Sequence, residues 1–416
     1  MLPIAKAGPG GATFLEALFT ATSAVCVTGH VIVDTPTFWS PFGQTAIMVL
    51  IQIGGFGIMT FASVIGLAVV RRLSLRSRIT AAAEAHSFGL GDVSALLLGV
   101  IRITLVVEAV VAVILSLRFA IGYGEPLGRA VWLGVFHAVS SFNNAGFALF
   151  SDNLIGFVSD PWICLPIAAS IIIGGLGFPV IMQLLKHVAL PRVWTMNTRL
   201  VLAGTVALLV LGTVYVTAIE WDNPGTLGPL AWPGKLLAGF FMAVQTRTAG
   251  FNSIDIAAMD PASWLGMDVL MLIGGGPAGT AGGIKITTFA VLFFILVTEL
   301  RGEGAVNVFG KRLPRSVHRQ AITVVLLAVA VVVTATVALM LITDVGMDRL
   351  LFEVVSAFGT VGLSTGITAD LPAAGQAILI LLMFIGRLGP ITFASALALR
   401  DRRTTYELPQ ERPVIG

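Results

Sequence analysis

The chain has 416 residues, of which 56% are hydrophobic and 11% are charged, with a mean hydropathy of +0.94. A soluble protein carries about 25% charged residues, so this composition excludes a wholly water-soluble protein and indicates that lipid surrounds most of the chain. The formal net charge is only +3, and Cys26 and Cys164 stand in apolar stretches, which argues against a disulfide framework or a zinc site.

The N-terminal residues form neither a secretory signal nor a spanning helix, because no basic start precedes an apolar core. The first apolar stretch, from Phe14 to Val25, has about a dozen residues, whereas a spanning helix needs about 20. It leads into a loop with Gly29 and then into a long apolar helix at about 44–70, interrupted at 53–57. We expect that a helix ahead of Phe14 is missing, through a wrongly assigned start or a truncation.

The order of spanning helix, half-helix, glycine loop and second helix then follows three more times. The helices are predicted at about 95–121, 130–141 and 162–185, then at 200–219, 233–245 and 264–300, and finally at 321–343, 350–358 and 376–399. The second helix of each round carries its own glycines, at 173–177, 273–283 and 385–389.

Two glycine patterns recur in register along the chain. The four glycine loops contain Gly29, Gly146, Gly250 and Gly362, roughly 100–120 residues apart. Each is followed 24 to 28 positions later by the first glycine of the second helix, at 54, 174, 274 and 386. Apolar helices often share glycines, but two patterns in register favour four copies of one unit. We predict an all-α polytopic membrane protein with repeats at 1–78, 79–199, 200–319 and 320–416. The first lacks its outer helix, the third has a broken inner helix, and the fourth ends in a short cytoplasmic tail.

Basic residues gather after the second helix of every repeat. They are Arg71, Arg72, Arg76 and Arg78, then Lys186, Arg192 and Arg199, then Arg301, Lys311, Arg312, Arg315 and Arg319, and finally Arg400, Arg402 and Arg403. By the positive-inside rule these clusters are cytoplasmic, so the glycine loops enter the cell membrane from outside and return there. The outer loops carry acids that would form a cation-attracting mouth, namely Asp34, Asp152, Asp160, Asp222, Asp255, Asp260, Asp344 and Asp370.

Non-helical backbone at membrane depth is tolerated only where protein buries it or where it lines a water-filled cavity. Four glycine loops on one axis would present rings of carbonyl oxygens that replace the water shell of a monovalent cation. Glycine suits such a filter because it adopts dihedral angles closed to other residues. The filter candidates are Val27, Thr28, Gly29, Asn144, Ala145, Gly146, Thr248, Ala249, Gly250, Thr360, Val361 and Gly362. Since only the glycine is common to all four loops, we expect fewer well-defined ion sites than in a uniform filter.

The stretches Thr20–Gly29, Thr246–Phe251 and Ser356–Ser364 resemble the filter motifs of the Trk/Ktr/HKT superfamily of potassium transporters. The resemblance is closest to the membrane subunit of bacterial Ktr systems and covers essentially the whole chain. It implies four membrane-pore-membrane units around a pseudo-fourfold axis, paired as a homodimer. It also implies a cytosolic ring of nucleotide-binding regulatory subunits, K⁺ at the filter carbonyls as substrate, and Na⁺ as an activator in some members.

The break in the third repeat is longer than its counterparts. It has six glycines within ten positions and a proline, so it cannot continue a helix. The resemblance assigns such a loop the role of a movable gate beneath the filter, and a static kink is the alternative. The gate glycines are Gly274, Gly275, Gly276, Gly279, Gly282 and Gly283.

Five charged or titratable residues lie near these loops. Arg387 is mid-helix, where a buried arginine is a functional candidate. The resemblance implies that it repels a waiting cation and donates to gate-loop carbonyls; snorkelling to an interface is the alternative. We predict that Arg247 and Glu353 lie on the third and fourth half-helices and pair. His30 replaces a residue that is usually apolar in the family, and is either a neutral vestibule histidine or a pH-sensitive plug. Lys285 has no assigned role.

Three classes of function are open to a membrane protein of this kind. The first is potassium uptake through a gated conduit. The second is a symporter coupled to Na⁺ or H⁺, a class that usually needs intramembrane carboxylates, of which Glu108 is almost the only mid-helix candidate. The third is a membrane enzyme, for which the sequence has no zinc-protease or serine-hydrolase motif and only five scattered histidines. We expect potassium uptake, with no enzyme activity, no cofactor bound by this chain, lipid around it and no nucleic-acid partner.

Overall fold

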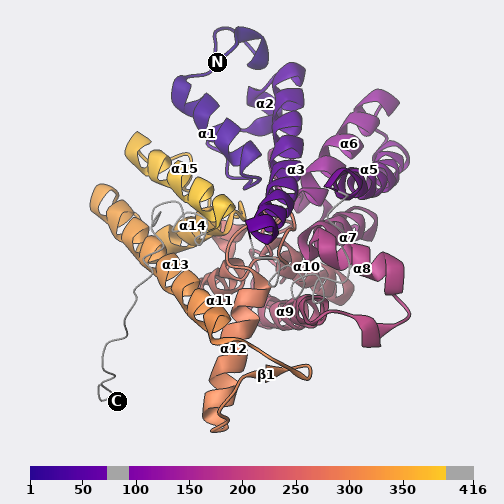
Figure 1. Cartoon of the computed structure of the whole chain (residues 1–416). Coiled ribbons are helices and arrows are strands. Elements are labelled where there is room, and N and C mark those ends of the chain that lie inside the picture. The colour runs from indigo at the N-terminus through magenta and orange to yellow at the C-terminus, as the bar shows by residue number, and fades with distance from the viewer. Residues whose placement is uncertain (73–92, 390–416) are drawn as a thin grey trace.

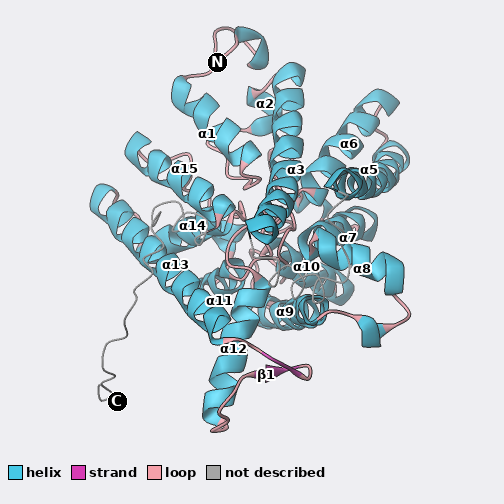
Figure 2. Ribbon diagram, viewed as in Figure 1, coloured by secondary structure: helices cyan, strands magenta, loops and turns pink. Residues whose placement is uncertain are grey.

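Helices surround a centre made of loops and follow one another around it in chain order (Figures 1 and 2). The computed structural model describes residues 1–72 and 93–389. In Figure 1 the colour runs around the centre from indigo to yellow, and the last described helix, α15 (Ala373–Leu388), contacts the first α-helix, α1 (Phe14–Val25). The circle therefore closes between the two ends of the chain.

The regular elements in the first half of the described chain are all helices or helical turns. After a 3-10 turn (Pro3–Ala5), its elements are α1, α2 (Thr35–Phe38), α3 (Pro41–Arg72), α5 (Val93–Leu117), a π-helical turn (Arg118–Gly122), α6 (Leu127–Phe142), a 3-10 turn (Ile155–Phe157), α7 (Pro161–Leu176), α8 (Phe178–His187) and a 3-10 turn (Pro191–Val193). A capping box starts α1, because Thr13 Oγ1 accepts from the N–H of Glu16 while Glu16 accepts from that of Thr13.

The second half adds one short hairpin to the helices. Its elements are α9 (Met196–Glu220), α10 (Trp232–Gln245), a 3-10 turn (Ile256–Ala258), α11 (Pro261–Leu272), α12 (Ile286–Leu300), β1 (Asn307–Val308), β2 (Lys311–Arg312), α13 (Arg315–Ile342), α14 (Met347–Gly359) and α15. The sequence did not predict the hairpin. Phe309 and Gly310 turn it with φ of 49° and 76°, the backbone of a tight two-residue turn.

Three described helices are long and apolar enough to cross a membrane. They are residues 98–122, α9 and α13, and α7 with α8 counts as a fourth if that bent pair is one span. Leu326 and Leu341 on α13 are 65% and 81% exposed, as expected of side chains that face lipid. The four half-helices α1, α6, α10 and α14 end at the central loops, close to the bounds predicted from the sequence.

Two predicted helices differ from the structure in continuity. The helix predicted at 162–185 bends by 100° between α7 and α8, because Gly177 has a φ of 90° and a proline follows at the second position of α8. The interruption predicted at 53–57 is wrong, since α3 runs through it. An added Cβ at Gly54 would meet the Val25 carbonyl, so this glycine serves close packing rather than a break.

The break predicted at 273–283 is confirmed, because α11 ends at Leu272 and α12 starts at Ile286. The end of the closing helix predicted at 376–399 lies beyond the described residues. So do five members of the basic clusters, Arg76, Arg78, Arg400, Arg402 and Arg403.

Candidate functional site

Each glycine loop follows a half-helix and passes twice through the left-handed region of backbone space. Two positions before the glycine, φ is 54°, 59°, 66° and 51° at Val27, Asn144, Thr248 and Thr360. At the glycines, φ is 94°, 69°, 80° and 93° at Gly29, Gly146, Gly250 and Gly362. A left-handed non-glycine residue costs about 1–2 kcal/mol, so the surrounding structure holds strain at the same place in all four loops.

The four glycine loops form a closed ring in chain order, within the loops at the centre of Figure 2. At each loop glycine, an added Cβ would lie less than 3.0 Å from the backbone oxygen of the residue that precedes another loop's glycine. The pairs are Gly29 with Ala145, Gly146 with Ala249, Gly250 with Val361, and Gly362 with Thr28. Real Cβ atoms do not come so close, so these positions accept only glycine.

Hydrogen bonds to the half-helices fix the glycine loops in place. The N–H groups of Thr28, Ala145 and Val361 donate to the carbonyl oxygens of Ser23, Ser140 and Ser356 at 2.8, 2.7 and 2.8 Å. The N–H groups of Gly29 and Gly362 donate to the hydroxyls of Ser23 and Ser356, each at 3.1 Å. Because these N–H groups are engaged, the loops have carbonyl oxygens rather than donors to offer a ligand, which suits a cation.

A hollow of about 330 Å³, which we call the vestibule, opens where the chain leaves the glycines. Its lining includes Gly29, Gly146 and Gly362 together with Asp34 and Asp152. These two acids are the part of the predicted acidic mouth that lines this hollow.

Three other acids of the predicted mouth act as helix caps. Asp160, Asp255 and Asp260 accept hydrogen bonds from backbone N–H groups two positions further on, at 2.9, 2.9 and 2.8 Å. A carboxylate at a helix N-terminus stabilises that terminus, so these residues have a structural reason to be acidic.

The break loop, residues 274–283, packs against the bend between α7 and α8. Its N–H groups at Gly276 and Thr280 donate to the carbonyl oxygens of Gly175 and Gly174 at 2.8 and 3.2 Å. An added Cβ at Gly282 would collide with the Thr360 side chain. The break loop therefore touches the fourth glycine loop, while backbone hydrogen bonds fix it to the C-terminal end of α7.

Two cationic side chains donate to adjacent carbonyl oxygens of the break loop. Arg387 donates through Nη1 to Thr280 O and through Nη2 to Gly54 O, the latter over 2.9 Å. Lys285 Nζ donates to Ala281 O over 2.6 Å. The contact of Arg387 with this loop is the one expected from the sequence, and Lys285, which had no assigned role, has a similar contact.

The predicted ion pair between Arg247 and Glu353 is wrong. Arg247 lies beyond α10, and its Nη2 is 3.4 Å from Gly274 O. Glu353 lies inside α14 and accepts from the hydroxyls of Ser364, at 2.8 Å, and Thr368. Arg247 follows the end of α10, whereas Glu353 lies more than one turn before the end of α14. Their side chains therefore reach different parts of the loops.

His30 is more enclosed than either sequence interpretation required. It is 1% exposed, although it contributes to the vestibule lining, and its Nδ1 lies 3.3 Å from Glu353 Oε1. The distance is that of an ion pair, while the orientation is not that of a hydrogen bond. The His30 side chain therefore does not project into the vestibule as a plug.

Sequence reasoning missed a polar cluster behind the second glycine loop. Asn143 Nδ2 donates to Gln52 Oε1 and Glu108 Oε1 at 3.0 and 3.1 Å, which joins α3, α5 and α6. The signal is the two consecutive asparagines at the end of a half-helix, of which only Asn144 is a filter candidate.

Asp268 was also missed, so the statement that Glu108 was almost the only mid-helix acid was wrong. This residue of α11 is 5% exposed, and within the described part of the chain its Oδ1 has no hydrogen-bond partner. A single acid inside an apolar run was the available signal, since intramembrane acids are functional candidates by default.

Comparison with known proteins agrees with the geometry. A family model described as "TrkH: Cation transport protein" matches residues 10–402. Ktr system potassium uptake protein B of Bacillus subtilis is 40% identical over 402 residues, 97% of this chain and 89% of that protein. The protein of the same name from Vibrio alginolyticus is 39% identical over 413 residues, 98% and 89% of the two chains. Potassium/sodium uptake protein NtpJ of Enterococcus hirae is 35% identical over 409 residues, 97% and 90%.

The fold matches a solved structure. The crystal structure of the potassium transporter TrkH from Vibrio parahaemolyticus superposes with a TM-score of 0.73 and covers 94% of this chain and 79% of that one, at 18% identity. That likeness shows a helical membrane-transporter fold. With the family model spanning nearly the whole sequence, the chain belongs to the TrkH family of cation transport proteins.

Proposed function

We propose that this chain takes up potassium across the cell membrane through a filter made of the four glycine loops. The observation that carries the proposal is their closed ring, in which each glycine lies against a carbonyl oxygen of another loop. Carbonyl oxygens replace the water shell of K⁺ without help from a charged side chain. Two relatives with at least 39% identity over almost the whole chain are named as potassium uptake proteins, which supports K⁺ as the ion.

The break loop is the proposed gate. It touches Thr360 of the fourth glycine loop, and it is held by single hydrogen bonds rather than by a continuous helix. Arg387 and Lys285 bring positive charge to the same loop, which would oppose a cation until the loop moves.

The proposed assembly has four repeats, with the boundaries given above, around a pseudo-fourfold axis. The order of the ring of glycines supports it. The basic clusters would be cytoplasmic, and the vestibule, with Asp34 and Asp152, would face outside. Two such chains would pair as a homodimer, with Na⁺ acting as an activator.

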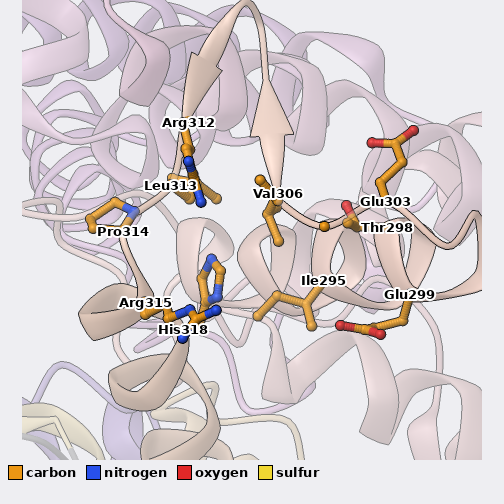
Figure 3. Close-up of a pocket in the computed structure, with 12 residues that line it drawn as sticks. Ile295, Thr298, Glu299, Glu303, Val306, Arg312, Leu313, Pro314, Arg315 and His318 are labelled. Carbon is orange, nitrogen blue, oxygen red and sulfur yellow. The ribbon is translucent and has the colours of Figure 1, made fainter.

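A cytosolic regulatory subunit is the proposed partner on the basic side. The β1–β2 hairpin connects α12 to α13, projects to the right of α12 in the lower part of Figure 1, and borders a hollow of about 490 Å³. In Figure 3, Arg312 and Arg315 lie on one side of this hollow, and Glu299 of α12 and Glu303, just beyond α12, lie on the other. Charges of both signs offer a partner a specific electrostatic surface.

A cation-coupled symporter is the second candidate. The observation that favours it is the presence of buried carboxylates at Glu108 and Asp268, since coupled transport usually needs intramembrane acids. Uptake into proteoliposomes that depends on a Na⁺ or H⁺ gradient, and stops when that gradient is removed, would support coupling over conduction.

Growth rescue tests the potassium proposal. A bacterium without its own potassium uptake systems should grow in low-potassium medium when it expresses this chain. Absence of rescue, with the protein detected in the membrane, would contradict transport.

Filter variants test the site in the same strain. Gly29→Ser and Gly362→Ser should lower the preference for K⁺ over Na⁺, because a side chain there collides with a backbone oxygen of a neighbouring loop. Gly124→Ser is the matched control, since Gly124 has a φ of 69° but open space around it. Equal loss in all three variants would indicate backbone strain rather than a filter.

A further inference from the structure

A buried polar contact joins the first and fourth glycine loops. His30 Nδ1 lies 3.3 Å from Glu353 Oε1, and both side chains are 0% exposed. Within the described part of the chain, neither ring nitrogen of His30 makes a hydrogen bond. The carboxylate is thus the polar group that faces an otherwise unsatisfied imidazole.

Glu353 is itself fixed to the loop segment that follows the fourth glycine. Its two oxygens accept separately from Ser364 Oγ, at 2.8 Å, and from Thr368 Oγ1. Ser364, Thr368 and His30 all belong to the vestibule lining. The carboxylate therefore connects the walls of the vestibule that follow Gly29 and Gly362.

The junction of the first and fourth loops differs from the other three. Chain segments of roughly 100–120 residues connect consecutive loops, whereas no segment leads from the fourth loop back to the first. Gly362 lies so close to Thr28 O that an added Cβ would collide with it. A small separation at this junction would alter two of the four sets of carbonyl oxygens.

Equivalent positions in the other loops lack such a pair. The residues directly after the other glycines are Phe147, Phe251 and Leu363. Nine positions before the other glycines stand Thr20, His137 and Phe241. His137 makes hydrogen bonds with nearby backbone groups, Leu133 O at 2.7 Å and the N–H of Leu149 at 3.3 Å, and its ring centroid lies 6.3 Å from that of Phe251 after the third glycine. The second and third loops thus have an aromatic contact at the equivalent positions, whereas the pair of imidazole and carboxylate joins the fourth loop to the first.

We propose that His30 and Glu353 are positioning residues that hold the first and fourth glycine loops together and thereby set K⁺ selectivity. A buried pair of polar groups carries a desolvation cost, and in some proteins such pairs specify register rather than add stability. The inference rests on the proposed filter. It adds the residues that keep the carbonyl spacing constant where the chain does not.

Selectivity measurements test this role. The ratio of KM for Na⁺ to KM for K⁺, from initial uptake rates into proteoliposomes, should fall roughly tenfold in His30→Leu and in Glu353→Gln. Glu353→Gln keeps an amide for Ser364 and Thr368 but removes the carboxylate from His30. His30→Asn keeps an N–H that can face the carboxylate, and should recover most of the ratio. The double variant should be no worse than the poorer single one, because both changes remove one interaction.

Glu220→Gln is the matched control. Glu220 is a buried carboxylate of α9 with donors from Thr226 Oγ1, at 2.6 Å, and the N–H of Asp260, at 2.9 Å, and it does not line the vestibule. This variant should change the yield of folded protein without changing the KM ratio. If Glu353→Gln does not reach the membrane, the comparison of His30→Leu with His30→Asn decides.

The outcomes separate this inference from the proposed filter. An unchanged ratio in His30→Leu, with a lowered ratio in Gly362→Ser, would overturn the positioning role alone. An unchanged ratio in both would contradict the filter as well. Equal loss in His30→Leu, His30→Asn and Glu220→Gln would also overturn the inference, since it would indicate general destabilisation.

Discussion

The hydroxyl of Thr280 donates a hydrogen bond to Asn144 Oδ1 over 3.0 Å, and both side chains are buried. The bond joins the break loop to a left-handed residue of the second glycine loop. Asn144 Nδ2 lies 3.4 Å from Arg247 O, next to the third glycine loop. The position of the break loop is thus linked to the backbone of two glycine loops.

Thr280→Val should raise the rate of potassium uptake. Valine keeps the shape of threonine but cannot donate to Asn144, and loss of one hydrogen bond costs about 1 kcal/mol. If the loop is the gate, this loss favours the displaced loop by about fivefold. Initial uptake rates at saturating K⁺ should rise by up to about that factor, with little change in KM.

Thr323→Val is the matched control. Thr323 is exposed on α13 and donates within its own helix to Arg319 O over 2.8 Å. Its uptake rate should equal that of the unaltered protein. A rate for Thr280→Val at or below the unaltered one would argue against a gate at this loop.

The sequence predicts most of the helices because apolar stretches of distinct lengths carry the signal. The bounds of α1 are those expected, and α9, α10 and α14 begin or end within a few residues of the prediction. The break at 273–283 was also predictable, since glycine and proline at this density exclude a helix.

Glycine content alone could not separate a break from close packing. The pattern at 53–57 lies in a continuous helix because Gly54 gives the Val25 carbonyl room to approach, whereas Gly177 allows a bend through its φ of 90°. The difference depends on what packs against each glycine, which local sequence does not contain.

Side-chain partners across the ring were less predictable than the loops. Arg247 and Glu353 have opposite charges on neighbouring segments, which suggests a pair. Opposite charges do not determine, however, where each side chain lies along its half-helix and loop. Glu353 contacts Ser364, Thr368 and His30, and such contacts depend on how the ring closes. Lys285 likewise had no sequence partner because its acceptor is a backbone oxygen.

Gly386→Ala should destabilise the protein. An added Cβ would collide with the backbone of Phe358, in the last turn of the fourth half-helix, and overpacking of this kind costs about 1–3 kcal/mol. The Tm of the purified protein in detergent should fall. Gly128→Ala on α6 is the control, because an added Cβ there meets nothing within 4 Å and its Tm should stay level or rise slightly. Equal Tm values for the two variants would contradict the packing account.

Asp160 fixes the start of α7 through three contacts. It accepts from Arg118 Nε at 2.7 Å, from the Tyr123 hydroxyl at 2.8 Å and from the N–H of Trp162 at 2.9 Å. Burial, with the hydrogen bond to Asp160, raises the pKa of Tyr123 to about 12, so this phenol keeps its proton at physiological pH.

Asp160→Asn should lower the Tm, and Asp160→Ala should lower it further. Asparagine keeps the helix cap and loses the ion pair, while alanine also loses the cap, which is worth about 1 kcal/mol. Glu125→Gln, which removes a more exposed ion pair with Arg129, should leave the Tm unchanged. The reverse order of the two Asp160 variants would show that the cap is not the stabilising contact.

Arg387 allows the charge at the break loop to be separated from its hydrogen bonds. The guanidinium uses two different nitrogens to reach Thr280 O and Gly54 O, which belong to the break loop and to α3. A lysine keeps the positive charge but has one nitrogen, so it cannot bridge both oxygens in this geometry. Glutamine removes the charge and keeps one amide donor.

We expect both Arg387→Lys and Arg387→Gln to raise the uptake rate, because each loses at least one charge-assisted hydrogen bond worth about 1.5–3 kcal/mol. The rate should rise by about tenfold or more in Arg387→Lys, and further in Arg387→Gln, where repulsion of the cation is also removed. If Arg387→Lys transports at the unaltered rate while Arg387→Gln is fast, charge alone closes the path and the bridge between Thr280 and Gly54 is dispensable. If neither variant exceeds the unaltered rate, Arg387 does not restrain the loop, and the gate must be sought elsewhere along the path below the ring.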